Sequence, residues 1–187
     1  MKFATSNPNK FAEAKEILAE VASKLGDFLE QIDIDVDEIQ STDVVEVVKH
    51  KARAAYQIAW EAVIVEDTWL YFEAWNGLPW ALIKWFLKTV NKDGILQMMK
   101  TFEHRKAKAI CCIGYFDGKD CIISTWTVKG HIATEIMWES TFGWDPIFIP
   151  EGHEKSFAQM SMEEKNAISH RGQAFREFKK LISGLSI

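Results

Sequence analysis

Ala62-Val63-Ile64-Val65 is a short run of apolar residues, and two carboxylates, Glu66 and Asp67, follow it directly. An unbroken apolar run of this length is typical of a strand that is covered on both faces. In α/β sheets, the ends of such strands are where ligands bind. We therefore expect a buried strand over residues 62–65 that stops at a pair of carboxylates with a functional role.

Helices and strands alternate around this run. Strands are expected over 2–5 and 28–36, and apolar residues at helical spacing predict helices over about 10–25 and 43–60. A turn at 76–79 leads to a helix over about 80–90, and a shorter helix follows near 94–101. This first half of the chain is typical of an α/β protein.

The second half begins with a hairpin. Two β-rich runs, 106–116 and 121–128, are separated by Asp117-Gly118-Lys119-Asp120, which has Asp-Gly at its centre. Further strands are expected over 131–137 and 144–149, and a capping box at 161–164 begins the helical C-terminal third. The last helix should bury Phe175, Phe178, Leu181 and Ile182. This order predicts an elongated mixed β-sheet with flanking helices rather than a purely parallel sheet.

Size and charge narrow the classes of function. The 187 residues can bury a real core, and the net charge is −5 without a block of lysines or arginines. A dedicated nucleic-acid binder is therefore not expected. We read no signal peptide and no run near the ~20 apolar residues of a membrane span, so no membrane partner is expected. The cysteines at 111, 112 and 121 fit a reduced cytoplasmic protein with core thiols.

The segment from residue 5 to residue 10 is the first candidate site. It lies between a strand end and a helix start, where unpaired backbone N–H groups and the helix dipole favour an anion. Thr5 and Asn7 could donate hydrogen bonds to phosphate oxygens, and Lys10 adds a positive charge. Plain capping of the helix by Asn7 explains the segment equally well.

The acidic residues form the second candidate site. Glu66 and Asp67 end the apolar strand, and Glu38 lies in an acidic loop. Such carboxylates suit Mg²⁺, which prefers oxygen ligands and is usually shared with substrate phosphates. One of them could instead take a proton from an attacking water. Solvated surface acids are the alternative, which is favoured for Glu38 taken alone.

Two aromatic and basic segments complete the candidates. The first is Phe142-Gly143-Trp144-Asp145-Pro146, in which an aromatic ring could stack on a purine while the carboxylate accepts hydrogen bonds from the edge of the purine. The alternative is a strand entry with a core aromatic residue. Cationic and polar side chains gather around the start of the last helix, where the helix dipole favours an anion. These side chains belong to Lys165, Ser169, His170 and Arg171. An exposed polar turn is the alternative interpretation.

In this order and spacing, the segments resemble the inosine triphosphate pyrophosphatase (Ham1/RdgB-like) family, nearly end to end. The Phe-Gly-Trp-Asp-Pro segment at 142–146 and the Ile-Ser-His-Arg-Gly segment at 168–172 are specific to that family. The other segments that carry the likeness are Thr5-Ser6-Asn7 with Lys10 and Glu13, Val65-Glu66-Asp67-Thr68, Asn76-Gly77-Leu78-Pro79 and Glu163-Glu164-Lys165-Asn166.

The resemblance implies a single domain over residues 1–187, with two lobes around a central cleft, and usually a homodimer. It implies an enzyme that hydrolyses non-canonical purine nucleoside triphosphates (ITP, dITP and XTP) to the nucleoside monophosphate and pyrophosphate, with Mg²⁺ as cofactor.

It also implies roles for residues. Glu38 and Asp67 would bind the metal, and Asp67, with Glu66 beside it, would act on the attacking water. The phosphates would be held by Thr5, Asn7 and Lys10, and the triphosphate would be approached by Lys51 and Lys84. The base would be enclosed and read by Phe142, Trp144, Asp145, Lys165, His170 and Arg171. The further substrate-binding residues would be Ser6, Thr68, Gly143 and Ser169.

The chain departs from the family pattern mainly through tryptophan. Ser6 and Trp80 stand where glycine is usual, and Trp69 stands where a small residue is usual. A glycine is also usual near Trp126, and Trp138 lies in a stretch that is normally not aromatic. Indoles at glycine positions could narrow the cleft, change the substrate or abolish turnover. Two alternatives therefore stay open: a catalytically silent nucleotide binder or engineered scaffold, and a Maf-type pyrimidine triphosphate pyrophosphatase.

Overall fold

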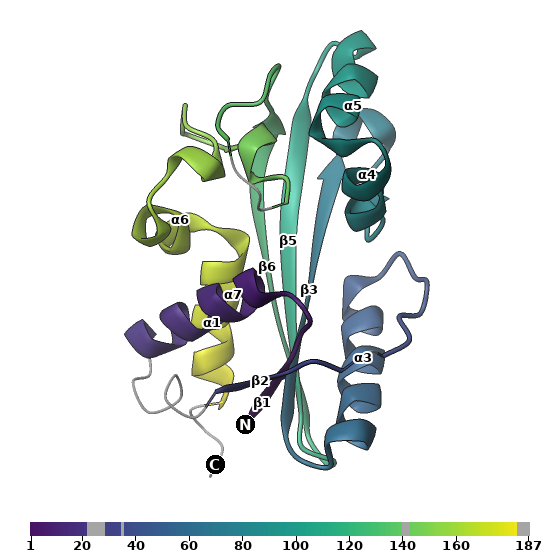
Figure 1. The fold of residues 1–187 in the computed structure, drawn as a ribbon, viewed down its shortest axis with the longest axis vertical. Coiled ribbons are helices and arrows are strands. Elements are labelled where there is room, and N and C mark those ends of the chain that lie inside the picture. The colour runs from purple at the N-terminus through teal and green to yellow at the C-terminus, as the bar shows by residue number, and fades with distance from the viewer. Residues whose placement is uncertain (22–28, 35, 140–142, 183–187) are drawn as a thin grey trace. The chain divides into compact units, whose positions relative to one another are not determined.

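The computed structural model describes residues 1–21, 29–34, 36–139 and 143–182 (Figure 1). It divides into two compact units. Unit 1 comprises Met1–Asp67, Cys111–Trp126 and Arg171–Ile187, and unit 2 comprises Thr68–Ile110 and Thr127–His170. The described helices include none that is long and apolar enough to cross a membrane.

Seven strands form one mixed sheet, in the order β2-β1-β3-β5-β6-β7 with β4 paired to β3. Their bounds are β1 Lys2–Ala4, β2 Glu30–Ile32, β3 Val63–Phe72, β4 Pro79–Trp80, β5 Lys106–Phe116, β6 Cys121–Ile132 and β7 Phe148–Pro150. β1 pairs in parallel with β2 and β3, whereas β4 and β7 pair antiparallel to β3 and β6. The predicted mixed α/β architecture is thereby confirmed, including the β5–β6 hairpin.

The helices flank this sheet. The α-helices are α1 Pro8–Val21, α3 Val44–Ala59, α4 Ile83–Thr89, α5 Asn91–Met98, α6 Met162–Ile168 and α7 His170–Ile182. The short 3-10 helices are Glu73–Trp75, Met99–Thr101, Asp145–Ile147 and Phe157–Gln159. The capping box at the start of α6 is formed as predicted, because the Ser161 side chain accepts from the backbone N–H of Glu164 and the Glu164 carboxylate accepts from that of Ser161.

In unit 1 the sheet is covered on both faces. Phe3, Ile64 and Cys111 pack in one cluster with α1 and α7, on one face. On the other face α3 packs so closely that a Cβ on Gly114 of β5 would lie 2.6 Å from Val48 Cγ1. Figure 1 shows α3 across the sheet from α1 and α7. The expectation that the apolar run at 62–65 is buried on both faces is therefore confirmed.

Unit 2 has its own core. Leu70, Phe72 and Ile132 from the strands pack with Ile83 of α4 and Ile95 of α5. The same cluster contains three aromatic residues from the segments around β7, Trp144, Phe148 and Phe157. The core explains why these short helices form, since each is held by the apolar face that it buries.

Several predicted boundaries were wrong. β3 does not stop at the carboxylates but continues to Phe72, because Trp69, Leu70 and Phe72 are buried and extend the strand. The strand expected over 131–137 is the end of β6, which stops at Ile132. The strand expected over 144–149 begins as a 3-10 helix with Pro146 in its first turn.

The expected helix over 80–90 begins later, at Ile83. Trp80 instead pairs with Leu70 in β4 and has φ of +35°, in the left-handed region that glycine occupies at little cost. The short helix near 94–101 is α5 followed by a 3-10 turn. Leu181 is 49% exposed, so α7 buries only three of the four residues predicted for its apolar side.

Candidate active site

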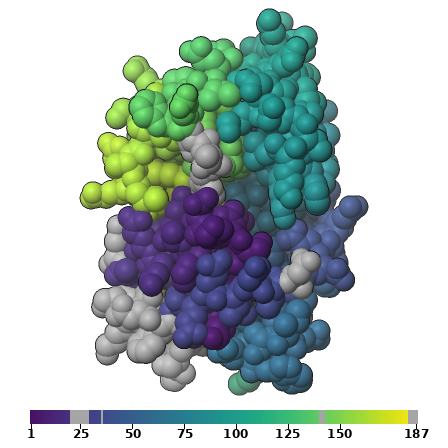
Figure 2. Space-filling view, in the orientation of Figure 1, coloured from purple at the N-terminus to yellow at the C-terminus, as the bar shows by residue number. Residues whose placement is uncertain are grey.

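The N-terminal segment uses its side chains to cap α1. Thr5 Oγ1 accepts from the backbone N–H of Asn7 at 3.1 Å, and Asn7 Oδ1 accepts from the N–H groups of Asn9 at 3.0 Å and Lys10 at 3.3 Å. The segment lies at the surface of unit 1 (purple in Figure 2), with Ser6 exposed. The start of the helix is thus accessible to an anion, although its two capping side chains already serve the backbone.

A buried ionic cluster lies behind this segment. Arg171 Nε and Nη2 donate to the two carboxylate oxygens of Glu66 at 3.0 Å each, and Nη1 donates to Glu13. Burial disfavours charge on this guanidinium, but the two carboxylates outweigh it and raise the pKa of Arg171 well above its usual range. Lys10 Nζ also lies 3.5 Å from Glu66 Oε1.

A second ionic group surrounds Asp67. Lys51 of α3 donates a hydrogen bond to Glu38 at 2.5 Å. Burial lowers the pKa of Lys51, but the negative charges of Asp67 and Glu38 outweigh burial and raise it. Burial, with Asp67 contributing, raises the pKa of the Cys112 thiol to about 11. Because consecutive strand residues point to opposite faces, Glu66 faces Arg171 while Asp67 faces α3 and Lys51.

The residues around Asp67 fit a cation that shares its ligands with phosphates. In the described part of the chain, no three acidic, histidine or cysteine side chains come together to hold a metal alone. One or two carboxylates are nevertheless what Mg²⁺ commonly uses when substrate phosphates and waters supply its other ligands. Glu38 and Asp67 could provide such a pair.

The segments predicted to read the base form an aromatic cluster in unit 2. The ring centroids of Trp144 and His170 lie 5.2 Å apart, with an angle of 31° between the ring planes. The ring centroid of Phe157 lies 5.9 Å from that of His170. Trp144 and His170 are both buried, so this cluster also belongs to the core of unit 2. Trp144 is therefore a core aromatic residue, as the alternative interpretation predicted. A stacking role additionally requires that one edge or face of its ring be accessible to the base.

Polar groups adjoin these rings. Lys165 Nζ donates to Asp145 Oδ2 at 2.6 Å, and both side chains are buried. Ser169, at the end of α6, is buried as well. Gly143 has φ of +53°, and among the residues that the structure describes, its chain neighbours apart, no atom lies within 4 Å of the position that a Cβ would take. Phe142 lies outside the described residues.

The structure thus gathers most, but not all, of the predicted residues into groups. Unit 1 brings Lys10 to Glu66 and Arg171, and Lys51 to Glu38 and Asp67. Thr68 lies half-buried in β3 of unit 2, and Lys84 is exposed on α4, with its Nζ 5.9 Å from the ring centre of Trp85.

Glu13 and Phe157 belong to these groups, although neither was predicted to have a role and Glu13 was named only for the family likeness. Glu13 is a carboxylate next to Ala14 on the buried side of α1, and that placement was an available signal for a buried ion pair. Phe157 carried no distinguishing signal, because an aromatic residue in a loop is most often a core residue.

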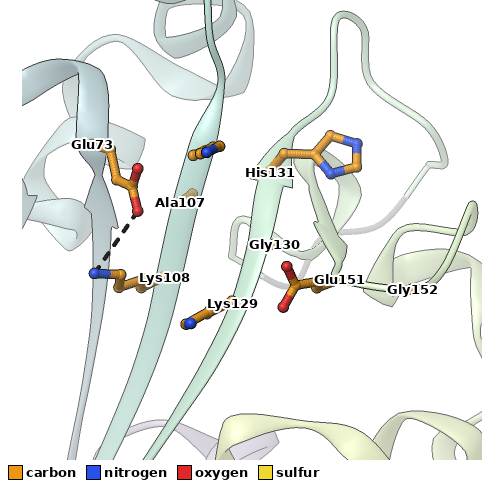
Figure 3. Close-up of a pocket in the computed structure, with 9 residues that line it drawn as sticks. Glu73, Ala107, Lys108, Lys129, Gly130, His131, Glu151 and Gly152 are labelled. Carbon is orange, nitrogen blue, oxygen red and sulfur yellow. Dashed lines mark ion pairs between the residues drawn. The ribbon is translucent and has the colours of Figure 1, made fainter.

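A hollow of about 420 Å³ opens on unit 2 away from these predicted residues. Figure 3 shows Glu73, Lys108, Lys129 and Glu151 around it, with an ion pair of 3.8 Å between Lys108 and Glu73. None of the residues that the sequence singled out for function lines it.

Comparison with known proteins agrees with the likeness. A profile of the Ham1 family matches residues 1–181. A dITP/XTP pyrophosphatase of Methanopyrus kandleri is 40% identical over 177 residues, which cover 94% of this chain and 92% of that protein. An inosine triphosphate pyrophosphatase of Scheffersomyces stipitis is 42% identical over 187 residues, covering 96% and 94%. A solved HAM1 protein from Coxiella burnetii is similar with a TM-score of 0.80 and 26% identity, covering 97% of each chain.

Proposed function

The chain belongs to the Ham1 family, and we propose that it hydrolyses non-canonical purine nucleoside triphosphates to the nucleoside monophosphate and pyrophosphate. The observation that carries the proposal is that relatives at about 40% identity are named for this activity. Their alignments cover nine-tenths or more of each chain. ITP, dITP and XTP are the expected substrates.

In this proposal unit 1 handles the triphosphate tail. The N-terminus of α1 and the ammonium group of Lys10 attract the phosphates, since the helix dipole and the charge both favour an anion. Glu38 and Asp67 would hold Mg²⁺, and Lys51 lies beside them as a further positive charge. The bound metal would stabilise the charge that develops on the pyrophosphate leaving group.

Asp67 is the better candidate to orient the attacking water. Both oxygens of Glu66 accept from Arg171 within a buried cluster, which leaves that carboxylate little capacity to take a proton. Asp67 is half-buried and lies on the face that carries Lys51 and Glu38. We therefore assign the water-orienting role to Asp67 rather than to Glu66.

Unit 2 supplies the groups for base selection. Hypoxanthine and xanthine present a 6-oxo acceptor, whereas adenine presents an amino donor at the same position. A donor held in place by its neighbours, such as His170 against Trp144, would be left unpaired against adenine. The paired Lys165 and Asp145 offer a further donor and acceptor. The chain's substrate would thus be chosen by hydrogen bonding more than by size.

A substrate panel tests the proposal. The pure protein is incubated with Mg²⁺ and, separately, ITP, dITP, XTP, GTP, dATP and UTP, and released pyrophosphate is measured. We expect the 6-oxo purines lacking a 2-amino group to be cleaved fastest and dATP slowest. Preferential release from UTP would support a Maf-type enzyme instead. A change in tryptophan fluorescence on adding nucleotide, without any pyrophosphate release, would support a silent nucleotide binder.

We further propose that the active form is a homodimer, as the family resemblance implies. Sedimentation velocity should then give a mass close to twice the 21.5 kDa of one chain at micromolar concentration. A single species at the mass of one chain would exclude this part of the proposal.

A further inference from the structure

Trp126 is one of the tryptophans by which this chain departs from the family pattern, and the proposed function gives it no role. It lies in β6, and its side chain is 38% exposed. Among the described residues of unit 1, Trp60 at the end of α3 is the only other exposed aromatic residue. An exposed indole offers a flat apolar surface, so its surroundings decide what it can bind.

The register of the β5–β6 hairpin gives the position of Trp126. Two contacts between the strands fix that register: the N–H of Ile132 donates to the carbonyl of Arg105 at 2.8 Å, and Thr125 Oγ1 donates to Cys112 Sγ at 3.4 Å. The two contacts are seven residues apart on each strand, so the pairing between them is regular and Trp126 lies opposite Cys111. Residues directly opposite in an antiparallel pair point to the same face. Trp126 is therefore on the face where Cys111 packs with α1 and α7.

The path of α7 along this face follows from two further contacts. Near the hairpin turn, the ring centroids of Tyr115 and Phe178 lie 6.4 Å apart. Further along β6, Ser124 Oγ donates to the carbonyl of Ala174 at 2.8 Å. The helix thus runs against the direction of β6. Trp126 lies about 7 Å beyond Ser124 along the strand, and the start of α7 lies about 6 Å before Ala174 along the helix. Trp126 is therefore at the level of the first turn of α7.

The surroundings of Cys111 agree with this placement. Burial raises the pKa of the Cys111 thiol well above its usual range, the charge of Glu66 raises it further, and the charge of Arg171 lowers it. Arg171, in the first turn of α7, is therefore close to the thiol that lies opposite Trp126. Glu66 and Arg171 are buried, whereas Trp126 is exposed. The indole thus lies on this face where the buried ion pair gives way to solvent.

We propose that Trp126 contacts the nucleoside end of the substrate, with its indole stacked on the purine base. This inference rests on the proposed function, which places the phosphates at Lys10. Lys10 contacts Glu66 of β3 at 3.5 Å, and β6 is two strands away from β3, about 10 Å at ordinary strand spacing. A nucleotide carries its base at the end opposite its phosphates. A ring on the same face, that far from the lysine, meets the base rather than the tail.

A stacked ring and a hydrogen-bonding group contribute differently to recognition. Every base has a π face, so an indole binds purines of each kind and adds affinity without choosing among them. Removing the Trp126 ring should therefore weaken the binding of all purine nucleotides alike. We expect the ratio of kcat/KM for ITP to that for GTP to stay within about threefold of the wild-type ratio in Trp126→Leu.

Two ligands separate the base from the tail. One is an ITP analogue with a methylene bridge between the α and β phosphates, which the enzyme cannot cleave there, and the other is pyrophosphate, which has no base. Titration calorimetry with Mg²⁺ measures both affinities. We expect Trp126→Leu to weaken binding of the analogue about fivefold or more and to leave binding of pyrophosphate within about twofold, whereas Trp126→Phe keeps a ring and most of the affinity. Trp60→Leu is the matched control, because it removes an exposed indole on α3, and should change neither affinity.

Tryptophan emission gives a readout that a purely structural role would not change. A base stacked on an indole quenches its fluorescence, so the analogue should lower the emission of the wild type. The decrease should be smaller in Trp126→Phe and unchanged in Trp60→Leu. Thermal melts by circular dichroism verify that each variant is folded, and the emission of Trp126→Phe decides the matter if Trp126→Leu folds poorly.

Three results would overturn the proposal. Trp126→Leu could bind the analogue as tightly as the wild type, or more tightly, which would mean that the indole makes no contact or obstructs the base. It could lose affinity for the analogue and for pyrophosphate equally, which would place the effect in the tail site or the fold. The wild type could fail to bind the analogue. If the wild type binds the analogue but cleaves no triphosphate, the proposed function fails, while the role of Trp126 is still judged from binding.

Discussion

Glu66 and Asp67 are consecutive residues of β3 that lie in different surroundings. The alternation of side chains along a strand sends Glu66 to the face with Arg171 and Glu13, and Asp67 to the face with Lys51. One carboxylate is therefore saturated by a guanidinium, and the other is half-buried beside an ammonium group. Their chemistry should differ accordingly.

We predict that Asp67→Asn lowers kcat for ITP by a factor of about 10²–10⁴, because the amide cannot accept a proton from water and binds a metal weakly. Its melting temperature should stay close to that of the wild type. Pyrophosphate release and circular dichroism measure the two quantities. Glu73→Gln, an exposed residue at the hollow of unit 2, serves as the control with unchanged turnover. Wild-type kinetics in Asp67→Asn would remove this residue from the mechanism.

The thiol of Cys112 makes stability depend on alkaline pH. Its pKa is raised by burial, and further by Asp67, from the ordinary 9.0 to about 11. Between these values the unfolded chain has lost a proton that the folded chain keeps, so the free energy of unfolding falls as pH rises. The largest slope from one such group is about 1.4 kcal/mol per pH unit.

We therefore predict that Cys112→Ala loses less stability than the wild type between pH 9 and pH 11, although it is less stable at pH 7 because it leaves a small cavity. Urea unfolding at several pH values measures the difference. Cys121→Ala is the control, since that thiol is only half-buried. Parallel pH profiles for the wild type and Cys112→Ala would contradict the assignment.

Single residues also show what the sequence could not foretell. The pair Glu66-Asp67 and the segment around Arg171 were predicted to be functional, because carboxylates after an apolar run and cations at a helix start are unusual. Which of these groups would pair was not recognisable, because Arg171 and Glu13 are 158 residues apart and nothing local brings them together. The buried ion pairs follow from the packing of α1 and α7 on the same face of the sheet.

At the level of elements, α3 has a well-formed start and an unfavourable end. Asp43 caps its N-terminus by accepting from the N–H of Val45 at 2.8 Å. At the other end Trp60 has φ of +55° and its N–H donates to Tyr56, which is the left-handed C-terminal geometry that glycine usually adopts. Its side chain is 82% exposed, so it gains little from burial.

We predict that Trp60→Gly stabilises the protein by about 1 kcal/mol, since the left-handed conformation of a residue with a Cβ costs about 1–2 kcal/mol and glycine avoids most of that. Trp60→Ala is the matched control: it removes the same indole but keeps the Cβ, and should gain little. The free energy of unfolding in urea measures both. Equal stability of the two variants would show that the backbone geometry is not the cause.

Elements with strong local signals were predicted well, and those set by tertiary contacts were not. The helix expected over 43–60 and the strand expected over 106–116 agree closely with α3 and β5, because their apolar periodicity is regular. The strand expected over 131–137 failed, because antiparallel pairing of β6 with β7 ends at Ile132 opposite Phe148. The helix near Trp80 failed because that residue pairs in β4.

The whole molecule has a net charge of −5 and yet is proposed to bind a highly charged anion. Long-range attraction from the protein therefore does not favour the substrate. Binding must rely on local cations, such as Lys10 and Lys51, and on a metal that arrives with the phosphates. The metal should consequently matter for catalysis without being part of the fold.

We predict that a chelator abolishes triphosphate hydrolysis, that added Mg²⁺ restores it, and that the melting temperature of the ligand-free protein is the same in both states. No cluster of three or more ligating side chains occurs among the residues that the structure describes, so metal binding should not contribute to folding as it does in structural zinc sites.

Mg²⁺ together with pyrophosphate should instead raise the melting temperature by several degrees, because a ligand at about 100 times its Kd stabilises by about 2.7 kcal/mol. Differential scanning calorimetry with chelator, with Mg²⁺, and with Mg²⁺ and pyrophosphate separates these states. Pyrophosphate with chelator is the control, and a melting temperature that drops on chelation alone would reveal a structural metal that the proposed site does not contain.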